Sequence, residues 1–335
     1  MQYLGVIIDT LAPVFLVVLL GAVLRRAGFL TERFASELNR FVFWVSLPAF
    51  LFLSIARSGS AADSVPAAAT MMASTLAIAA VAYLGAPLFG IPPRSRGTFC
   101  QCVFRSNNAY VGLPVIAFAF GGAPIETQMA VHSLAALSLA PCLVLYNILA
   151  VIVLMPNEMG AFDGNGAAAG PARPPVGRIL RGIARNPLII GCLSGAAALA
   201  ARSALGIPPG APVGTVFIDR TLNQVGSLAG PGALLALGAS LTPERIRAAW
   251  RPANAVAFLK LAACPLFGLL FASLLHLDGN ARLVALIYLT CPTAVASFVM
   301  AQQMKGDAAM AGAAVALTTL YSSVALAILL AMHPL

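Results

Sequence analysis

The residues best suited to binding chemistry lie inside a long apolar stretch, where polar side chains are costly. Residues 106–115 read SNNAYVGLPV, so two amides, Asn107 and Asn108, precede Gly112 and Pro114. Asn, Gly and Pro each weaken a helix. Within hydrocarbon an interruption is tolerated only where protein or a watery cavity satisfies the freed backbone groups. We therefore expect residues 107–114 to be unwound and to line a cavity, with Pro114 starting a second half-helix.

A second segment of the same character lies in a later apolar stretch, where Pro292 stands between Thr290 and Thr293. Proline is favoured in the first turn of a helix, so Pro292 is expected to start a half-helix as well. Two half-helix N-termini, each with a positive partial charge, would then point at one place. The alternative is that each proline only kinks its helix.

Two cations indicate the charge of the ligand. Arg105 and Lys260 lie well inside apolar stretches, at depths where a charged side chain usually faces a cavity or a partner. The alternative is that either side chain snorkels to the membrane surface. A cavity with two cations and two helix N-termini would suit a small organic anion, such as a mono- or dicarboxylate. The candidate substrate-binding residues are Arg105, Asn107, Asn108, Gly112, Pro114, Lys260, Thr290, Pro292 and Thr293.

Nothing in the sequence indicates catalysis or a cofactor. The six cysteines fall inside apolar stretches, and Cys100 and Cys102 form C-x-C rather than the C-x-x-C of a metal site. The chain lacks D-D-x-x-D, H-E-x-x-H and G-x-S-x-G motifs. We therefore predict neither enzymatic activity nor a metal or cofactor.

The elements that position these residues follow from composition. The chain has 335 residues, of which 60% are hydrophobic and 9% charged, whereas soluble domains carry about 25% charged residues. Its apolar runs are continuous, without the alternation of barrel strands, so we predict an all-α integral membrane protein. The ten predicted spans are 4–24, 38–56, 66–90, 98–120, 125–155, 186–205, 215–240, 253–276, 281–302 and 308–331.

The net charge of +9 is better explained by orientation than by a nucleic-acid partner. If the loops are taken alternately, most Lys and Arg lie on one side, and the other side has only Arg57, Arg202, Arg220 and Arg282. By the positive-inside rule the first side is cytoplasmic, so both termini are predicted to lie outside the cytoplasm.

The sequence also shows a weak internal repeat. SLPAFLFLSIA at 46–56 aligns with AGPGALLALGA at 229–239, which pairs Pro48 with Pro231, and a similar offset pairs Pro114 with Pro292. Both offsets equal five spans, and an odd number of spans inverts the copy, as in many secondary transporters. We therefore predict a first five-helix repeat over 1–155, a cytoplasmic linker over 156–185 and a second repeat over 186–335. In alternating access, the fourth and ninth spans would rock against the second and seventh.

These motifs carry a family resemblance. The fourth-span pattern Asn107-x-x-x-x-Gly112-x-Pro114, its Pro292 counterpart and the stretches LAPVFLVVLLGAVLRRAGFL and FVFWVSLPAFLF resemble the auxin efflux carrier family of permeases. The resemblance implies a five-plus-five inverted repeat with broken, crossing fourth and ninth helices. It also implies transport of organic anions, including auxin in plants and malate- or malonate-like dicarboxylates in bacteria. The short central connection favours a bacterial inner-membrane permease.

The expected partners are a small organic anion and membrane lipid, without nucleic acid, and a homodimer is a further candidate assembly. The main alternative function is a sodium- or proton-coupled carrier of the bile-acid symporter or exchanger kind, which shares the crossed-helix plan. Buried acidic pairs typify exchangers of that kind, and the predicted spans have none. A membrane enzyme and a channel are less well supported, because catalytic motifs and filter repeats are missing.

Overall fold

The structure is a computed structural model, and it describes residues 2–57, 64–158, 185–208, 210–277 and 279–332. Most of the predicted linker 156–185 therefore lies outside the described residues. The elements of the first half, in chain order, are α1 (Gln2–Arg26), α2 (Glu32–Phe41), η1 (Val42–Ser46), α3 (Leu47–Ala56), α4 (Val65–Gly85), η3 (Ala86–Phe89), α5 (Pro93–Phe104), η4 (Asn108–Gly112), α6 (Leu113–Ala119) and α7 (Ile125–Glu158).

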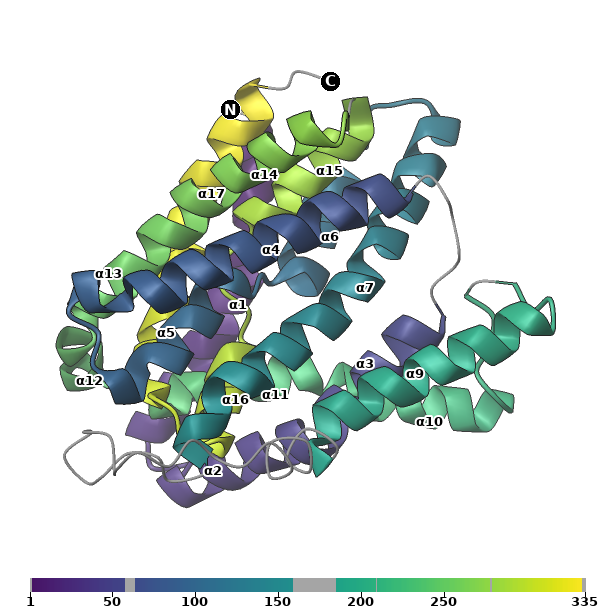
Figure 1. The fold of residues 1–335 in the computed structure, drawn as a ribbon. Coiled ribbons are helices and arrows are strands. Elements are labelled where there is room, and N and C mark those ends of the chain that lie inside the picture. The colour runs from purple at the N-terminus through teal and green to yellow at the C-terminus, as the bar shows by residue number, and fades with distance from the viewer. Residues whose placement is uncertain (1, 58–63, 159–184, 209, 278, 333–335) are drawn as a thin grey trace.

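The second half is also helical (Figure 1). Its elements are α9 (Pro187–Ala204), α10 (Val216–Ser227), α11 (Ala229–Ser240), α12 (Pro243–Ala248), α13 (Trp250–Phe258), η5 (Leu259–Ala263), α14 (Cys264–Leu274), α15 (Gly279–Thr290), α16 (Ala296–Gln303) and α17 (Ala308–Met332).

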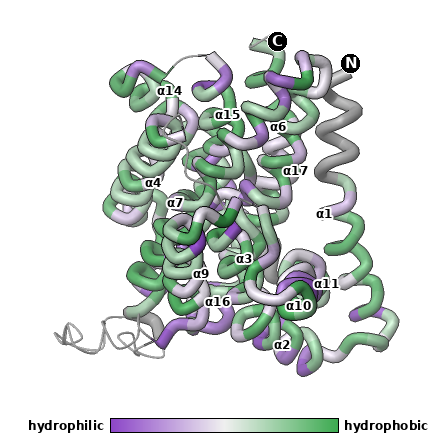
Figure 2. Tube along the Cα trace, turned by 90° about the vertical axis from the view of Figure 1, so that its right-hand side faces the viewer, coloured by the Kyte–Doolittle hydropathy of each residue, from purple (hydrophilic) through white to green (hydrophobic). Residues whose placement is uncertain are grey.

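Six helical stretches of the described residues are long and apolar enough to cross a membrane. They are Glu32–Ala56, Val65–Phe89, Ile125–Met155, Pro187–Ala204, Trp250–Leu274 and Ala308–Met332. The remaining predicted spans fall on α1, on α5 with α6, on α10 with α11, and on α15 with α16. Hydrophobic residues predominate along most of the described chain, whereas α2 and α10 carry hydrophilic stretches (Figure 2). The protein is therefore an all-helical membrane protein.

Small residues let two pairs of helices approach closely. α1 packs along α11, and α3 packs along α9. A Cβ atom on Gly238 of α11 would lie 1.9 Å from the Val18 carbonyl oxygen, and one on Gly191 of α9 would lie 2.8 Å from that of Pro48. These helix backbones are in direct contact, which is the usual way that helices associate where no hydrophobic effect drives them together.

Within the part of the chain that the structure describes, three helices contain a widened π-helical turn, and each of these turns ends two residues before a proline. The turn η1 precedes Pro48, η4 precedes Pro114, and η5 precedes Pro265. A proline in a helix lacks the N–H donor and its ring clashes with the carbonyl one turn earlier. Widening the preceding turn removes that clash while the helix continues. These prolines therefore reshape helices without ending them.

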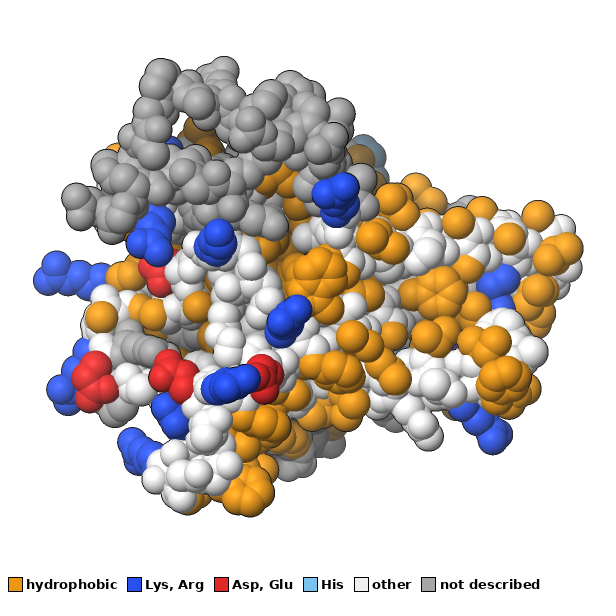
Figure 3. All heavy atoms as spheres, turned by 90° about the horizontal axis from the view of Figure 1, so that it is seen from below, with side chains coloured by type: hydrophobic (Ala, Val, Ile, Leu, Met, Phe, Trp, Pro, Cys, Tyr) orange, Lys and Arg blue, Asp and Glu red, His pale blue; other side chains and the backbone are white. Residues whose placement is uncertain are grey.

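Charged side chains gather at the end of the molecule where α2 and α12 lie, as Figure 3 shows from below. The helix α2 is capped by Thr31, whose hydroxyl accepts from the Phe34 N–H at 3.0 Å. It carries an exposed ion pair between Arg33 and Glu37 at 2.9 Å. The start of α1 and the end of α17 lie at the opposite end (Figure 1).

Replacing Gly238 by Ala is expected to force α1 and α11 apart, because the new methyl group meets backbone that cannot move alone. We expect a loss of about 1–3 kcal/mol of stability, the usual effect of overpacking. Thermal unfolding of the detergent-purified protein measures this loss as a lower midpoint. Gly85→Ala is the matched control, since nothing lies within 4 Å of the added atom. Equal midpoints for the two variants would contradict the close approach.

Candidate functional site

Helical structure stops at two places that lie side by side. The helix α5 ends at Phe104 and η4 begins at Asn108, while α15 ends at Thr290 and α16 begins at Ala296. The Asn107 N–H donates to the Pro292 carbonyl at 2.8 Å, and the Ala294 N–H donates to the Arg105 carbonyl at 3.0 Å. The segments 105–107 and 291–295, here called the crossover, form an isolated antiparallel bridge between Ser106 and Thr293. The freed backbone groups thus satisfy one another.

The first interruption, residues 105–107, overlaps the predicted unwound segment 107–114 only at Asn107. Residues 108–119 are helical, and the Asn107 carbonyl accepts from the N–H groups of Val111 and Gly112 at their start. Pro114 lies in the first turn of α6 but does not start the helix, because η4 widens ahead of it. Gly112 has a helical backbone. This glycine is needed for close packing rather than for unwinding the chain, since an added Cβ would lie 2.6 Å from Cδ1 of Tyr288.

The second interruption also differs from the prediction, because α16 begins after Pro292 rather than at it. Pro292 supplies the carbonyl that pairs with Asn107. The Thr290 hydroxyl donates to the Leu286 carbonyl at 2.8 Å, within its own helix. The Thr293 hydroxyl donates to the Cys102 carbonyl at 2.7 Å, at the end of α5. Thr293 therefore ties the crossover to α5, whereas Thr290 bonds only within its own helix, and neither residue lines the cavity that lies against the crossover.

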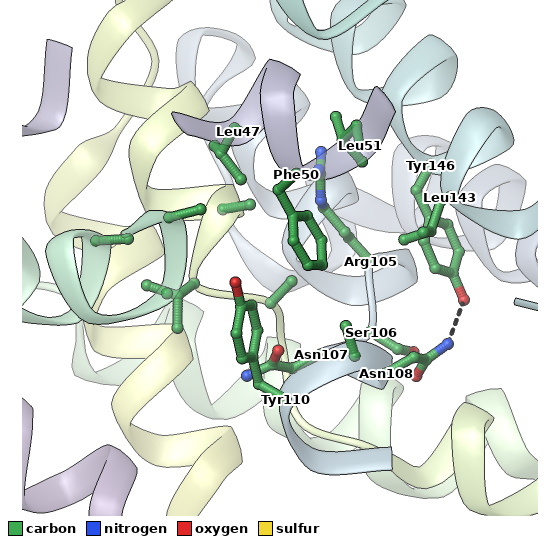
Figure 4. A pocket seen from close by; sticks show the side chains of 17 residues that line it. Leu47, Phe50, Leu51, Arg105, Ser106, Asn107, Asn108, Tyr110, Leu143 and Tyr146 are labelled. Atoms are coloured by element: carbon green, nitrogen blue, oxygen red, sulfur yellow. Dashed lines mark hydrogen bonds between the residues drawn. The ribbon is translucent and has the colours of Figure 1, made fainter. Parts of the chain in front are cut away.

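A cavity of about 50 Å³ lies against the crossover (Figure 4). Three of the predicted site residues line it, namely Arg105, Asn107 and Asn108. The other six predicted residues do not. The lining also includes residues that the sequence analysis did not select: Leu47, Phe50 and Leu51 of α3, Ser106, Ala109, Tyr110, Leu143 and Tyr146 of α7, Ala229, Gly230 and Ala233 of α11, and Ala294, Val295 and Ala296.

Arg105 is a buried cation at this cavity, with 4% of its surface exposed. Its guanidinium donates to the Asn147 side-chain oxygen at 2.8 Å and to the sulfur of Met300. Both partners are uncharged, so neither neutralises the guanidinium. Arg105 therefore does not snorkel to the surface, and it gives the cavity wall a positive charge.

Lys260 is fully buried but stands behind the cavity rather than in it. Its ammonium, carried by the widened turn η5, donates to the hydroxyl of Ser106, which does line the cavity. The nearest sulfur contact is Cys264 at 4.0 Å. Lys260 thus places a second basic group on the crossover and reaches the cavity through Ser106.

The two neighbouring amides differ in their surroundings. The Asn108 side-chain nitrogen donates to the Tyr146 hydroxyl at 3.4 Å, while its oxygen is buried without a hydrogen-bond partner among the described residues. No described residue hydrogen-bonds to the Asn107 side chain, which lines the cavity. Asn107 is therefore the amide with its full hydrogen-bonding capacity free for a ligand.

Replacing Ser106 by Ala is expected to destabilise the protein by about 1–3 kcal/mol, because the buried Lys260 ammonium loses its hydroxyl acceptor. The same change in a Lys260→Met background should cost much less, since no buried charge is left unpaired. Thermal unfolding of the four proteins gives the coupling between the two sites. Additive effects of the two substitutions would contradict the contact between Ser106 and Lys260. The control is Ser138→Ala, because Ser138 is a buried serine whose hydroxyl bonds within its own helix.

Comparison with known proteins identifies the family. A family model described as membrane transport protein matches residues 6–330. An uncharacterized transporter of Methanocaldococcus jannaschii is 22% identical over 325 residues, 96% of each chain. An uncharacterized transporter of Methanothermobacter thermautotrophicus is 31% identical over 115 residues, 34% of this chain and 38% of the relative. The chain therefore belongs to the membrane transport protein family of auxin efflux carriers and related permeases.

Proposed function

We propose that the protein is a secondary transporter that moves a small organic anion, a mono- or dicarboxylate, by alternating access at the crossover. The observation that carries this proposal is the position of Arg105, which is buried at a cavity without a charged partner in its hydrogen bonds. A carboxylate would supply the missing negative charge and accept two parallel hydrogen bonds from the guanidinium. The free amide of Asn107 would add a donor beside it.

The small volume of the crossover cavity supports a binding site that enlarges when the protein changes conformation, rather than a site that is open at all times. At about 50 Å³ it holds a few waters, whereas small-molecule sites measure roughly 300–1,000 Å³. One wall comes from the crossover, and the facing wall comes from α3 and α11, where Ala229, Gly230 and Ala233 are small. Separation of these two bodies would enlarge the space between them. The described conformation is thus best explained as a closed one.

The predicted ten-span inverted repeat is part of this proposal. The two interrupted segments come from opposite halves of the chain, and α1 pairs with α11 as α3 pairs with α9. The start of α1 and the end of α17 lie away from the charged face of Figure 3, which agrees with termini outside the cytoplasm. We further propose a bacterial inner-membrane location, on the basis of the family resemblance.

Purified protein in liposomes tests the function directly. We expect flux of at least one labelled carboxylate from a panel containing acetate, benzoate and malonate, measured with and without a proton gradient. Asn107→Ala and Lys260→Ala are each expected to abolish this flux, the first by removing a donor and the second by removing charge from the crossover. Size-exclusion profiles and thermal midpoints check that both variants remain folded.

Asn254→Ala is the matched control, because Asn254 lies on α13 beside Tyr321, away from the crossover cavity. Its flux should equal that of the unmodified protein. Normal flux in both Asn107→Ala and Lys260→Ala would show that the crossover is not the anion-binding site. Flux that requires sodium ions would instead favour a carrier of the bile-acid symporter kind.

A further inference from the structure

A second cavity, of about 380 Å³, adjoins the crossover cavity. Its volume falls within the usual range for small-molecule sites, roughly 300–1,000 Å³. The cavity lies between the end of α3 and the end of α10, and its polar lining residues are Ser54, Arg57, Asn223 and Ser227. We call it the Arg57 cavity.

The two cavities share a wall formed by one aromatic pair. Phe50 and Tyr110 line both cavities, and their rings stack with centroids 5.7 Å apart at an angle of 20° (Figure 4). The pair joins α3 to η4, which directly follows the crossover. The Tyr110 ring packs directly against Gly230, where an added Cβ would lie 2.7 Å from the ring. Movement of the crossover relative to α3 would separate these rings and connect the cavities.

The Arg57 guanidinium at the second cavity makes fewer hydrogen bonds than its nitrogen atoms allow. Arg57 donates to one carboxylate oxygen of Asp219 at 2.6 Å, and the other oxygen of Asp219 accepts from the Val213 N–H at 2.7 Å. The Arg57 Nε atom is buried and has no hydrogen-bond partner among the described residues. Leaving a buried charged donor unsatisfied is costly, so an acceptor is expected at this position.

We propose that the Arg57 cavity is a second binding site for a carboxylate, which waits there before the Phe50–Tyr110 pair opens to the crossover. The carboxylate accepts from the Arg57 guanidinium when that side chain turns away from Asp219, which brings the buried Nε to the cavity, so the carboxylate and Asp219 compete for Arg57. Asn223, Ser54 and Ser227 supply further polar groups, and the rings of Phe50 and Tyr110 cover the organic part. This inference rests on the proposed function, because it assumes the same class of substrate.

Thiol protection in lipid nanodiscs tests this site separately from transport. Ser227→Cys introduces an exposed thiol into the cavity, whereas all six native cysteines are buried. Labelling by a neutral maleimide is followed with acetate, benzoate or malonate present. We expect at least one of these to slow labelling. Arg57→Gln in this background should raise the concentration for half-protection about tenfold, as expected for one lost charge-assisted hydrogen bond.

Two further variants separate binding from misfolding. Asp219→Asn leaves a polar side chain but removes the competing charge, so protection should need about tenfold less carboxylate. Arg220→Gln removes the same charge as Arg57→Gln from an exposed position on α10, and it should leave protection unchanged. Asn107→Ala should lose flux but keep protection, because Asn107 lines only the crossover cavity.

The possible failures are distinct. Flux without any protection of Cys at position 227 would overturn the second site and leave the transport proposal intact. Protection that is equally strong in Arg57→Gln and Asp219→Asn would also overturn it, because the charge at Arg57 would then play no part. Neither flux nor protection with any of the three carboxylates would overturn the proposed substrate class itself, and the second site with it.

Discussion

The structure depends on one constraint, which is that polar backbone groups inside an apolar helical bundle must be paired. The non-helical segments 105–107 and 291–295 satisfy one another through the bonds between Asn107 and Pro292 and between Ala294 and Arg105. Neither interruption could persist alone, because its freed N–H and C=O groups would lack partners. The crossover is therefore a joint product of both halves of the chain.

The surroundings of the crossover follow from this pairing. Thr293 fixes one segment to the end of α5 through the Cys102 carbonyl, and Lys260 contacts the other through Ser106. The bridge directs Arg105 and Asn107 to the same small cavity. Two basic side chains thus lie on or beside one short stretch of backbone, and each would favour an anion there when protonated.

The arrangement also explains how a tightly packed protein could open. The contacts between the crossover and α3 or α11 consist largely of small or apolar residues, with the stacked pair of Phe50 and Tyr110 between two cavities. Such contacts can slide or separate without leaving charges unpaired. The widened turns η1, η4 and η5 lie in helices that reach this region, and π-helical turns are often found at functional sites.

What the sequence determined by itself was the membrane environment, the helical class and the family, because hydrophobicity, charge and motif spacing are local properties of the chain. It also selected Arg105, Asn107 and Asn108, which the structure places at the cavity. It could not separate Asn107, which lines the cavity, from Gly112, which packs against Tyr288. It also could not select Phe50 or Tyr110, since an aromatic residue in an apolar helix looks the same whether it faces a cavity or lipid. Only the tertiary structure decided that Lys260 acts through Ser106, because that contact joins residues far apart in the chain, which packing alone brings together.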